Sequence, residues 1–214
     1  MFLTYTELHN NTFYDLLSPT STTKIDIKES AAVNGRGVHL AGVTRVACTS
    51  SKDLLALVAG GNKHRATAAT NLNERSSRSH AVMTIEVERM AASDGDGGGS
   101  ELQCVKMGKM NIVDLAGSER VQLSGVTGEA LVEASAINAS LSALGDVLNA
   151  LSKLHKSQHQ SKEKAPPSSS FIPFRNSKLT HLLKDSLGGN CKTCMIATVR
   201  PGSAFYGQSL STLR

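Results

Sequence analysis

The sequence contains no tryptophan, and aromatic residues make up only 4% of its 214 residues. Its core must therefore be built mainly from Leu, Val, Ile and Ala side chains. No run of about 18 apolar residues is present, so we expect no membrane-spanning helix. The first residues, MFLTYTELHN, lack a basic segment followed by an apolar run, so we expect no signal peptide.

Cysteine is also sparse, with four residues in the chain. Without secretory features, this small number indicates a reducing compartment. Cys191 and Cys194 form a C-x-x-C pair, a spacing that zinc and redox sites use. Cys48 and Cys104 are isolated and supply no second pair, so we favour packing roles for the cysteines over metal or redox chemistry.

Charge is present but unevenly distributed. Hydrophobic residues make up 40% and charged residues 19%, typical of one globular domain or a large part of one. The formal net charge is +5, whereas residues 152–192 alone contain eight Lys or Arg and two Asp or Glu, a net charge of +6. This local excess indicates an acidic partner, which could be nucleic acid, an anionic membrane or a protein surface; a solvated basic loop is the alternative.

Hydrophobic periodicity predicts an α/β fold. Strands are expected over residues 2–8, 23–29, 37–46, 80–90, 101–115 and 194–199. Helices are expected over residues 50–61, along an apolar stripe from Ile137 to Leu151, and over residues 176–189, with Asn176 as the cap of this last helix and Gly188-Gly189 as its end. The Gly-rich segment between residues 90 and 101 predicts a hairpin between the strands that flank it.

Residues 111–120 read NIVDLAGSER, an apolar strand that ends at Asp114 and is followed by Gly117. In nucleoside triphosphatases, an aspartate in this position holds Mg²⁺, and a glycine N–H approaches the γ-phosphate because no side chain obstructs it. Many strands end in Asp and turn at Gly, so this motif alone is also compatible with a structural turn.

A second motif strengthens the nucleotide interpretation. Residues 71–80 read NLNERSSRSH, in which Ser76, Ser77 and Ser79 surround Arg78. Serine hydroxyls can ligate Mg²⁺ and orient a water molecule near a phosphate. A Ser-rich loop between a helix and a strand is the alternative, but the combination with DLAGSE makes a phosphate site the better interpretation.

Together the two motifs resemble switch I and switch II of the kinesin motor domain. The resemblance extends over nearly the whole chain, in the family order, through five further segments: YTELHNNTFYDLLSP, GNKHRATAATNLNERSSRSH, INASLSALGDVLNALS, FIPFRNSKLTHLLKDSLGGNCKTCMIATVRP and SLSTLR. It implies a partial kinesin-type P-loop NTPase fold, with a central, mostly parallel sheet and helices on both faces. The implied parts are switch I at 71–80, switch II at 111–120, the relay helix at about 128–156, and loop 12 with helix 5 at about 157–189.

The resemblance also implies roles for individual residues around ATP or ADP and Mg²⁺. Asp114 is expected to face Mg²⁺ through water, and Gly117 to donate its N–H to the γ-phosphate. Ser77, with Ser76 beside it, resembles the switch I serine that reaches Mg²⁺ and the attacking water.

A charged pair between the two switches is implied as well. Arg78 and Glu119 resemble the pair that bridges the switches when the site closes. Such a bridge would position the attacking water and couple the phosphate state to the relay helix.

The acidic partner implied by the family is tubulin. Arg175 and Lys178 match the microtubule-binding face, and Lys153 and Lys156 add charge beside it. We therefore expect microtubule binding in the cytoplasm, without nucleic-acid binding or membrane insertion. His181 stands where the family usually has arginine, which weakens the expected charge of this face.

One family feature is not found: the 214 residues contain no G-x-x-x-x-G-K-[ST] phosphate loop. We therefore expect the C-terminal two-thirds of a motor domain, lacking the first strands, the phosphate loop and the neck linker, and inactive alone. The alternatives are a non-catalytic microtubule-binding module and another P-loop NTPase. The absence of an N-K-x-D base motif and the presence of SSRSH disfavour a small GTPase.

Overall fold

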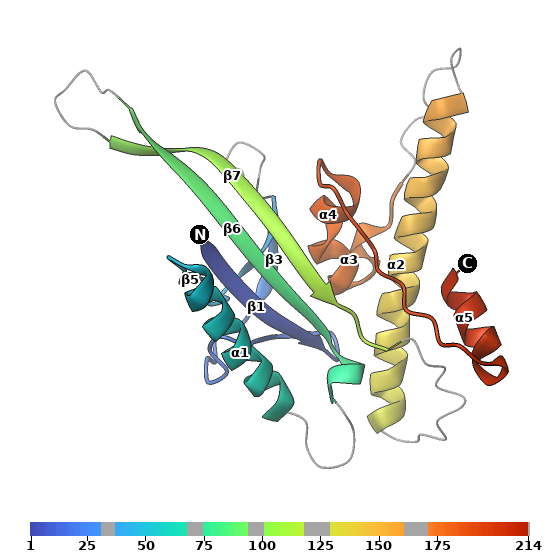
Figure 1. Ribbon diagram of the computed structural model, residues 1–214. Helices are drawn as coiled ribbons and strands as arrows, with labels where there is room; N and C mark the ends of the chain where they lie inside the picture. The colour runs from blue at the N-terminus through green and yellow to red at the C-terminus, as the bar shows by residue number, and fades with distance from the viewer. Residues whose placement is uncertain (31–36, 68–74, 94–100, 118–128, 161–170, 214) are drawn as a thin grey trace.

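The computed structural model describes residues 1–30, 37–67, 75–93, 101–117, 129–160 and 171–213 (Figure 1). The main sheet has five strands: β1 (Phe2–His9), β2 (Thr12–Asp15), β5 (Val46–Ala47), β6 (His80–Ser93) and β7 (Glu101–Asp114). They lie in the order β2-β1-β6-β7, and β5 pairs with β1. β3 (Asp26–Glu29) and β4 (Val38–Ala41) form a separate two-stranded sheet.

The predicted α/β class and the predicted hairpin are confirmed, but the direction of strand pairing is not as expected. β6 and β7 pair over their whole length as the long antiparallel hairpin that dominates Figure 1. Every other pair of the described strands is also antiparallel, whereas we expected a mostly parallel sheet. Local connectivity explains the β1–β2 pair, because these strands are joined by a two-residue turn and only antiparallel neighbours can be joined so tightly.

Side-chain alternation gives the sheet two apolar faces. On one face, Leu3 and Ile85 pack with Cys48 and with apolar residues of α1 (Ser51–Thr67). On the other, Leu8 and Val82 pack against α3 (Lys178–Leu182). Helices therefore cover both faces, as predicted, with α1 on one side and α3 on the other (Figure 1).

The α1 helix begins as expected but ends later. Ser50 Oγ accepts from the N–H of Asp53, and Asp53 Oδ2 accepts in return from the N–H of Ser50, which satisfies the first turn. We predicted an end at residues 60–61, but the helix continues to Thr67. Gly61 is required by packing instead, since a Cβ there would lie 2.5 Å from the ring of Tyr5.

The C-terminal part is helical. It contains α2 (Glu129–Gln160), which runs past the predicted end at 156, then η4 (Phe174–Asn176), α3, α4 (Lys184–Gly188), η5 (Ser203–Phe205) and α5 (Tyr206–Leu213). The cap of α3 is Ser177, not Asn176, because Ser177 Oγ accepts from the N–H of Thr180. The predicted end is correct, with Gly189 as the C-cap of α4.

The predicted strand at residues 194–199 is wrong. Residues 191–200 are exposed and without regular structure. Their apolar pattern, with Ile196 86% exposed, is that of a strand, but a strand also needs a neighbour, and none of the described strands pairs with it. Within the described ranges, no helix is long and apolar enough to cross a membrane.

Candidate functional site

The two sequence motifs meet at one edge of the main sheet. Asp114 is the last residue of β7 and lies opposite Ala81 of β6. The 3₁₀ turn η2 (Arg75–Arg78) leads into β6 and carries Ser77. The N–H of Gly117 donates to the carbonyl oxygen of Ser77 at 2.8 Å. Asp114, Ser77 and Gly117 therefore lie together, as the nucleotide interpretation requires.

Arg65 of α1 joins this edge and was not singled out from the sequence. Its Nη1 donates to Asp114 Oδ2 at 2.7 Å and its Nη2 to the carbonyl oxygen of Ser79 at 3.1 Å. Only 10% of the Arg65 side chain is exposed, against 70% of Asp114. A buried guanidinium thus anchors a solvent-facing carboxylate, and helix α1 becomes part of the site.

A buried carboxylate balances the charge of Arg65. Glu7 of β1 is 1% exposed, and its Oε1 lies 3.9 Å from Arg65 Nε. The same Oε1 accepts from Ser79 Oγ at 2.6 Å. Because a buried charge is costly unless it is paired and hydrogen-bonded, removal of either Glu7 or Arg65 would leave the other charge uncompensated beside the start of β6.

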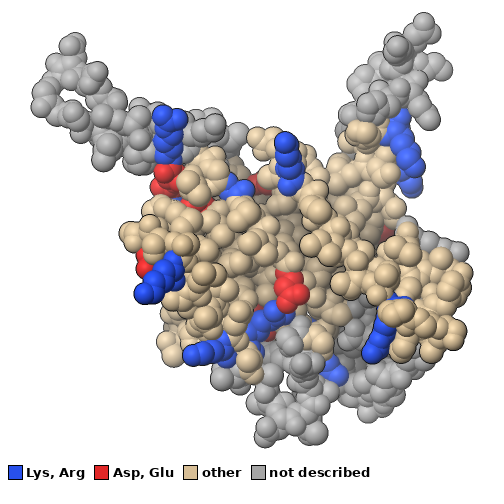
Figure 2. Space-filling view, viewed as in Figure 1, with Lys and Arg blue, Asp and Glu red and all other residues tan. Residues whose placement is uncertain are grey.

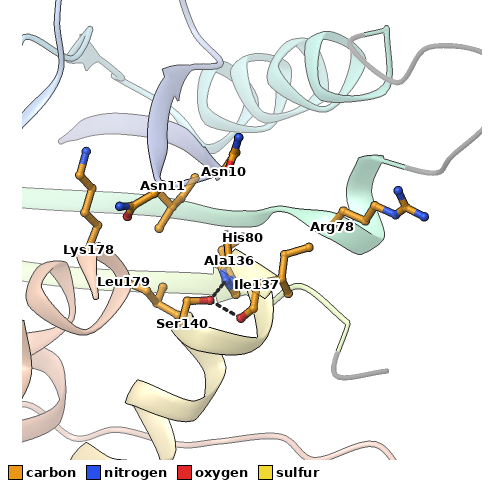
Figure 3. Close-up of a pocket in the computed structure, with 10 residues that line it drawn as sticks. Asn10, Asn11, Arg78, His80, Ala136, Ile137, Ser140, Lys178 and Leu179 are labelled. Atoms are coloured by element: carbon orange, nitrogen blue, oxygen red, sulfur yellow. Dashed lines mark hydrogen bonds between the residues drawn. The ribbon is translucent and has the colours of Figure 1, made fainter. Parts of the chain in front are cut away.

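His80 links the Asp-x-x-Gly turn to the long helix α2. Its Nδ1 accepts from the N–H of Ala116 at 3.0 Å, so the ring proton must lie on Nε2. Nε2 in turn lies 2.7 Å from Ser140 Oγ, which donates to the carbonyl oxygen of Ile137 at 2.7 Å (Figure 3). One imidazole therefore connects the backbone after β7 with the first half of the described part of α2.

Burial lowers the pKa of His80 to about 4. The nearby Arg65 guanidinium lowers the pKa further, and Asp114 opposes it. The ring is consequently neutral at physiological pH, which keeps Nδ1 available as an acceptor for the Ala116 N–H.

The pocket beside His80 is not a nucleotide site. It is lined by residues of the β1–β2 turn, α2 and α3, among them Asn10, Ser140 and Leu179, and by Arg78 (Figure 3). Its volume is about 30 Å³, room for about one or two water molecules. The side chain of Arg78 extends away from His80 and Ser140, and its expected partner Glu119 lies outside the described residues.

The residues at the sheet edge are compatible with Mg²⁺ in the manner of phosphate-transfer enzymes. No cluster of three or more His, Cys, Asp or Glu side chains is found in the described ranges. Mg²⁺ is usually bound by one or two carboxylates together with water and substrate phosphates. Asp114 offers one carboxylate that is 70% exposed, although its Oδ2 already accepts from Arg65. Nothing is described of the Ser76 side chain.

The basic residues predicted to bind microtubules lie on the helical side of the molecule. Lys153 and Lys156 are exposed on α2, Arg175 is exposed on η4, and Lys178 is half-buried at the start of α3. The face in Figure 2 shows basic side chains standing singly, without a continuous patch among the described residues. The charge of this part of the chain is therefore spread over several elements.

Arg175 has a partner that the sequence did not reveal. Glu29 of β3 accepts from Arg175 Nη2 at 3.0 Å, and also from His181 Nε2 and Lys184 Nζ. These contacts, together with the hydrogen bond of Arg65 to Asp114, join residues 49 to 155 positions apart in the sequence. A local sequence pattern cannot predict contacts between residues so far apart in the chain. Among the site residues that were not predicted, only His80 lies within a motif, as the last residue of SSRSH.

The three cysteines whose side chains the structure describes divide into two kinds. Cys48 is buried and packs on the sheet, as we expected, whereas Cys191 and Cys194 are exposed, so the packing role predicted for them is wrong.

Comparison with known proteins identifies the family. The kinesin motor domain family model matches residues 1–214. The human kinesin-like protein KIF13B is 42% identical over 213 residues, and Klp68D of Drosophila melanogaster is 40% identical over 212 residues. Each alignment covers 99% of this chain, but only 11% and 24% of those proteins.

Solved structures agree with this assignment. A KIF14 dimer bound with AMP-PNP to a microtubule has a TM-score of 0.76 at 35% identity, and a structure described as a fast kinesin has 0.73 at 35% identity. Each match covers 99% of this chain. It spans 55% of the KIF14 chain and 53% of the fast kinesin chain, about half of each. The chain belongs to the kinesin motor domain family.

Proposed function

We propose that this chain carries the nucleotide-sensing switches and the microtubule-binding face of a kinesin ATPase, and that it serves ATP-dependent movement along microtubules. The observation that carries the proposal is the hydrogen bond from the Gly117 N–H to the Ser77 carbonyl. It joins the two motifs at the edge where β7 delivers Asp114. Family membership supports the assignment of the motifs to switch I and switch II.

The family binds ATP or ADP with Mg²⁺, and the bound groups supply the phosphoryl group and the cation that neutralises its charge. On the protein side, Asp114 would hold the cation through water, and Ser77, with Ser76 beside it, would hold it directly. Gly117 would donate its N–H to a phosphate oxygen.

In the structure the Gly117 N–H donates to Ser77 instead. One N–H cannot donate at full strength to two acceptors. Exchange of the carbonyl for a phosphate oxygen would therefore loosen the link between the two motifs. Arg78 and Glu119 would then form the alternative bridge, so that the nucleotide state selects between two arrangements of the same loops.

Turnover tests the catalytic part of the proposal. The 214 residues contain no backbone cradle and lysine of the G-x-x-x-x-G-K-[ST] type to hold the β- and γ-phosphates. Positioning of reacting groups is worth about 7–11 kcal/mol, and loss of about half of it lowers the rate by roughly three orders of magnitude. We expect no ATP hydrolysis by the 214-residue chain and microtubule-stimulated hydrolysis after an upstream kinesin phosphate-loop segment is joined to it. Motor-like turnover without that segment would contradict the expectation that the 214-residue chain is inactive alone, and a lack of hydrolysis by the extended chain would contradict the proposed ATPase function.

Microtubules are the proposed partner, with the cytoplasmic cytoskeleton as the location; we propose neither nucleic-acid binding nor membrane insertion. Arg175, Lys178, Lys153 and Lys156 are the proposed contacts. We expect weak binding that falls steeply with salt, because dispersed charges steer encounter more than they fix a docked state. Cosedimentation with microtubules in rising salt measures this, and the double substitution R175A/K178A should weaken it. Equal binding by the double variant at high salt would refute the assignment of this face.

A non-catalytic microtubule-binding module is the second candidate. The extended chain separates the two candidates, since a binding module gains no ATPase activity when that segment is added.

A further inference from the structure

Glu29 lies at the centre of a cluster of three basic side chains. Its Oε1 accepts from Arg175 Nη2 at 3.0 Å and from His181 Nε2 at 2.7 Å, and its Oε2 accepts from Lys184 Nζ at 3.0 Å. The three donors come from η4, α3 and α4, which follow one another in the chain, and α3 contacts β3. Their hydrogen bonds lower the pKa of Glu29 to about 2, so the carboxylate is charged at every physiological pH.

The cluster is open to solvent. Arg175 is 75% exposed, Lys184 39%, Glu29 31% and His181 21%. Exposed ion pairs are weak, each worth about 0–1 kcal/mol, because water competes for both partners. The basic side chains can therefore exchange Glu29 for a carboxylate of another molecule. Two other carboxylates near β3 have different partners: Asp26 pairs with Lys24, and Asp185 accepts from the backbone N–H of Val38.

The β3–β4 hairpin does not depend on Glu29 for its position. Asp185 Oδ2 accepts from the N–H of Val38 at 2.6 Å, and Lys109 Nζ donates to the carbonyl oxygen of Val38 at 2.6 Å. Ile27 and Leu40 pack against the apolar cluster around α3. Loss of the Glu29 charge would thus free three basic side chains and leave the hairpin in place.

We propose that Glu29 is a built-in competitor: it occupies the carboxylate-binding position formed by Arg175, His181 and Lys184, and an acidic protein surface must displace it to bind there. This inference rests on the proposed microtubule-binding function, which assigns Arg175 to the binding face. It adds Lys184 to that face, of which His181 was already expected to be part, and makes Glu29 the residue that sets its affinity.

The experiment compares Glu29→Gln with Asp26→Asn. Both substitutions lie on β3 and raise the net charge by one, but only the first frees the cluster. Cosedimentation with microtubules polymerised from purified tubulin is measured over a salt series, and circular dichroism verifies folding. We expect Glu29→Gln to bind about two- to fivefold more tightly than Asp26→Asn, the range that exposed ion pairs allow. In a chain that also carries Arg175→Ala, the gain in affinity from Glu29→Gln should be smaller, because one of the three basic side chains is absent.

The outcomes are distinct. Equal gains from the two substitutions would show that only net charge matters, and weaker binding by Glu29→Gln would show that Glu29 organises the cluster; either result overturns the inference. If the unmodified chain does not sediment with microtubules at any salt concentration, the proposed function itself fails and the inference fails with it.

Discussion

Replacement of His80 by glutamine should make the free energy of unfolding less sensitive to acid. In the native state, protonation of the ring must occur at Nδ1, the atom that accepts from the Ala116 N–H. It would break that hydrogen bond and place a positive charge near Arg65, in a site where His80 is 3% exposed. The glutamine side chain of the variant keeps a donor for Ser140 but does not titrate.

The magnitude follows from the two pKa values. The pKa of His80 is about 4 in the folded protein, against an ordinary value of 6.5. Above pH 6.5 the ring is neutral in both states and contributes no pH dependence. As the pH falls below 6.5, the unfolded chain takes up a proton that the folded chain refuses, so stability decreases down to about pH 4. Each unit of pKa difference is worth about 1.36 kcal/mol, which gives a total loss of about 3 kcal/mol.

Urea unfolding followed by circular dichroism between pH 4 and pH 8 measures this loss. We expect the difference in unfolding free energy between the unmodified chain and His80→Gln to be constant above pH 7. Between pH 7 and pH 4 the unmodified chain should lose about 3 kcal/mol of unfolding free energy relative to the variant. NMR of the imidazole nitrogens gives an independent reading of the Nε2–H tautomer. Parallel pH profiles of the two proteins, or a ring that titrates near pH 6.5, would refute the reasoning.

Two further predictions concern packing. Leu179 has no exposed surface, so Leu179→Ala should lower the unfolding free energy by about 2–5 kcal/mol. Leu55 of α1 is 65% exposed, so Leu55→Ala should change the unfolding free energy by less than about 0.5 kcal/mol. Urea unfolding measures both changes. In α1, a Cβ at position 60 would have no atom within 4 Å, so Gly60→Ala should raise the unfolding free energy by about 0.5–1 kcal/mol. A Cβ at position 61 would clash with the Tyr5 ring, so Gly61→Ala should lower the unfolding free energy by about 1–3 kcal/mol. Thermal melts of this pair should shift in opposite directions.

The parts of the site that could be predicted from the sequence are those encoded by neighbouring residues. DLAG and SSRSH each place chemistry at a strand end, and the hairpin between β6 and β7 follows from alternation on both sides of a Gly-rich segment. Once that hairpin forms, Asp114 must lie near the start of β6, because the register pairs it with Ala81. Local pattern and antiparallel geometry together were sufficient to bring the two motifs to one edge.

Contacts between distant segments could not be predicted in this way. The partner of Asp114 is Arg65 on α1, and that of Arg175 is Glu29 on β3. Both depend on how helices dock on the sheet, which periodicity does not specify. The incorrect prediction of a strand at 194–199 has the same cause, because a short apolar run shows that a segment can pair but not which strand it pairs with.

The exposed edge of the sheet leads to the last prediction. β7 ends the strand order of the main sheet as described, so its outer edge carries backbone donors and acceptors without a strand neighbour there. On the face shared with α1, Val87, Met110 and Ile112 are 52%, 52% and 46% exposed. An apolar strip beside an open edge favours pairing with another chain.

We therefore expect the purified chain to self-associate as its concentration rises, and Ile112→Lys to suppress this by placing a charge on the strip. Size-exclusion chromatography with light scattering measures the effect. Leu55→Lys is the matched control, since it adds the same charge at an exposed position of α1, where no strand edge is available to pair. If both variants reduce self-association equally, net charge and not the β7 edge drives it. A chain that stays monomeric at all concentrations would show that the edge is protected despite its exposure.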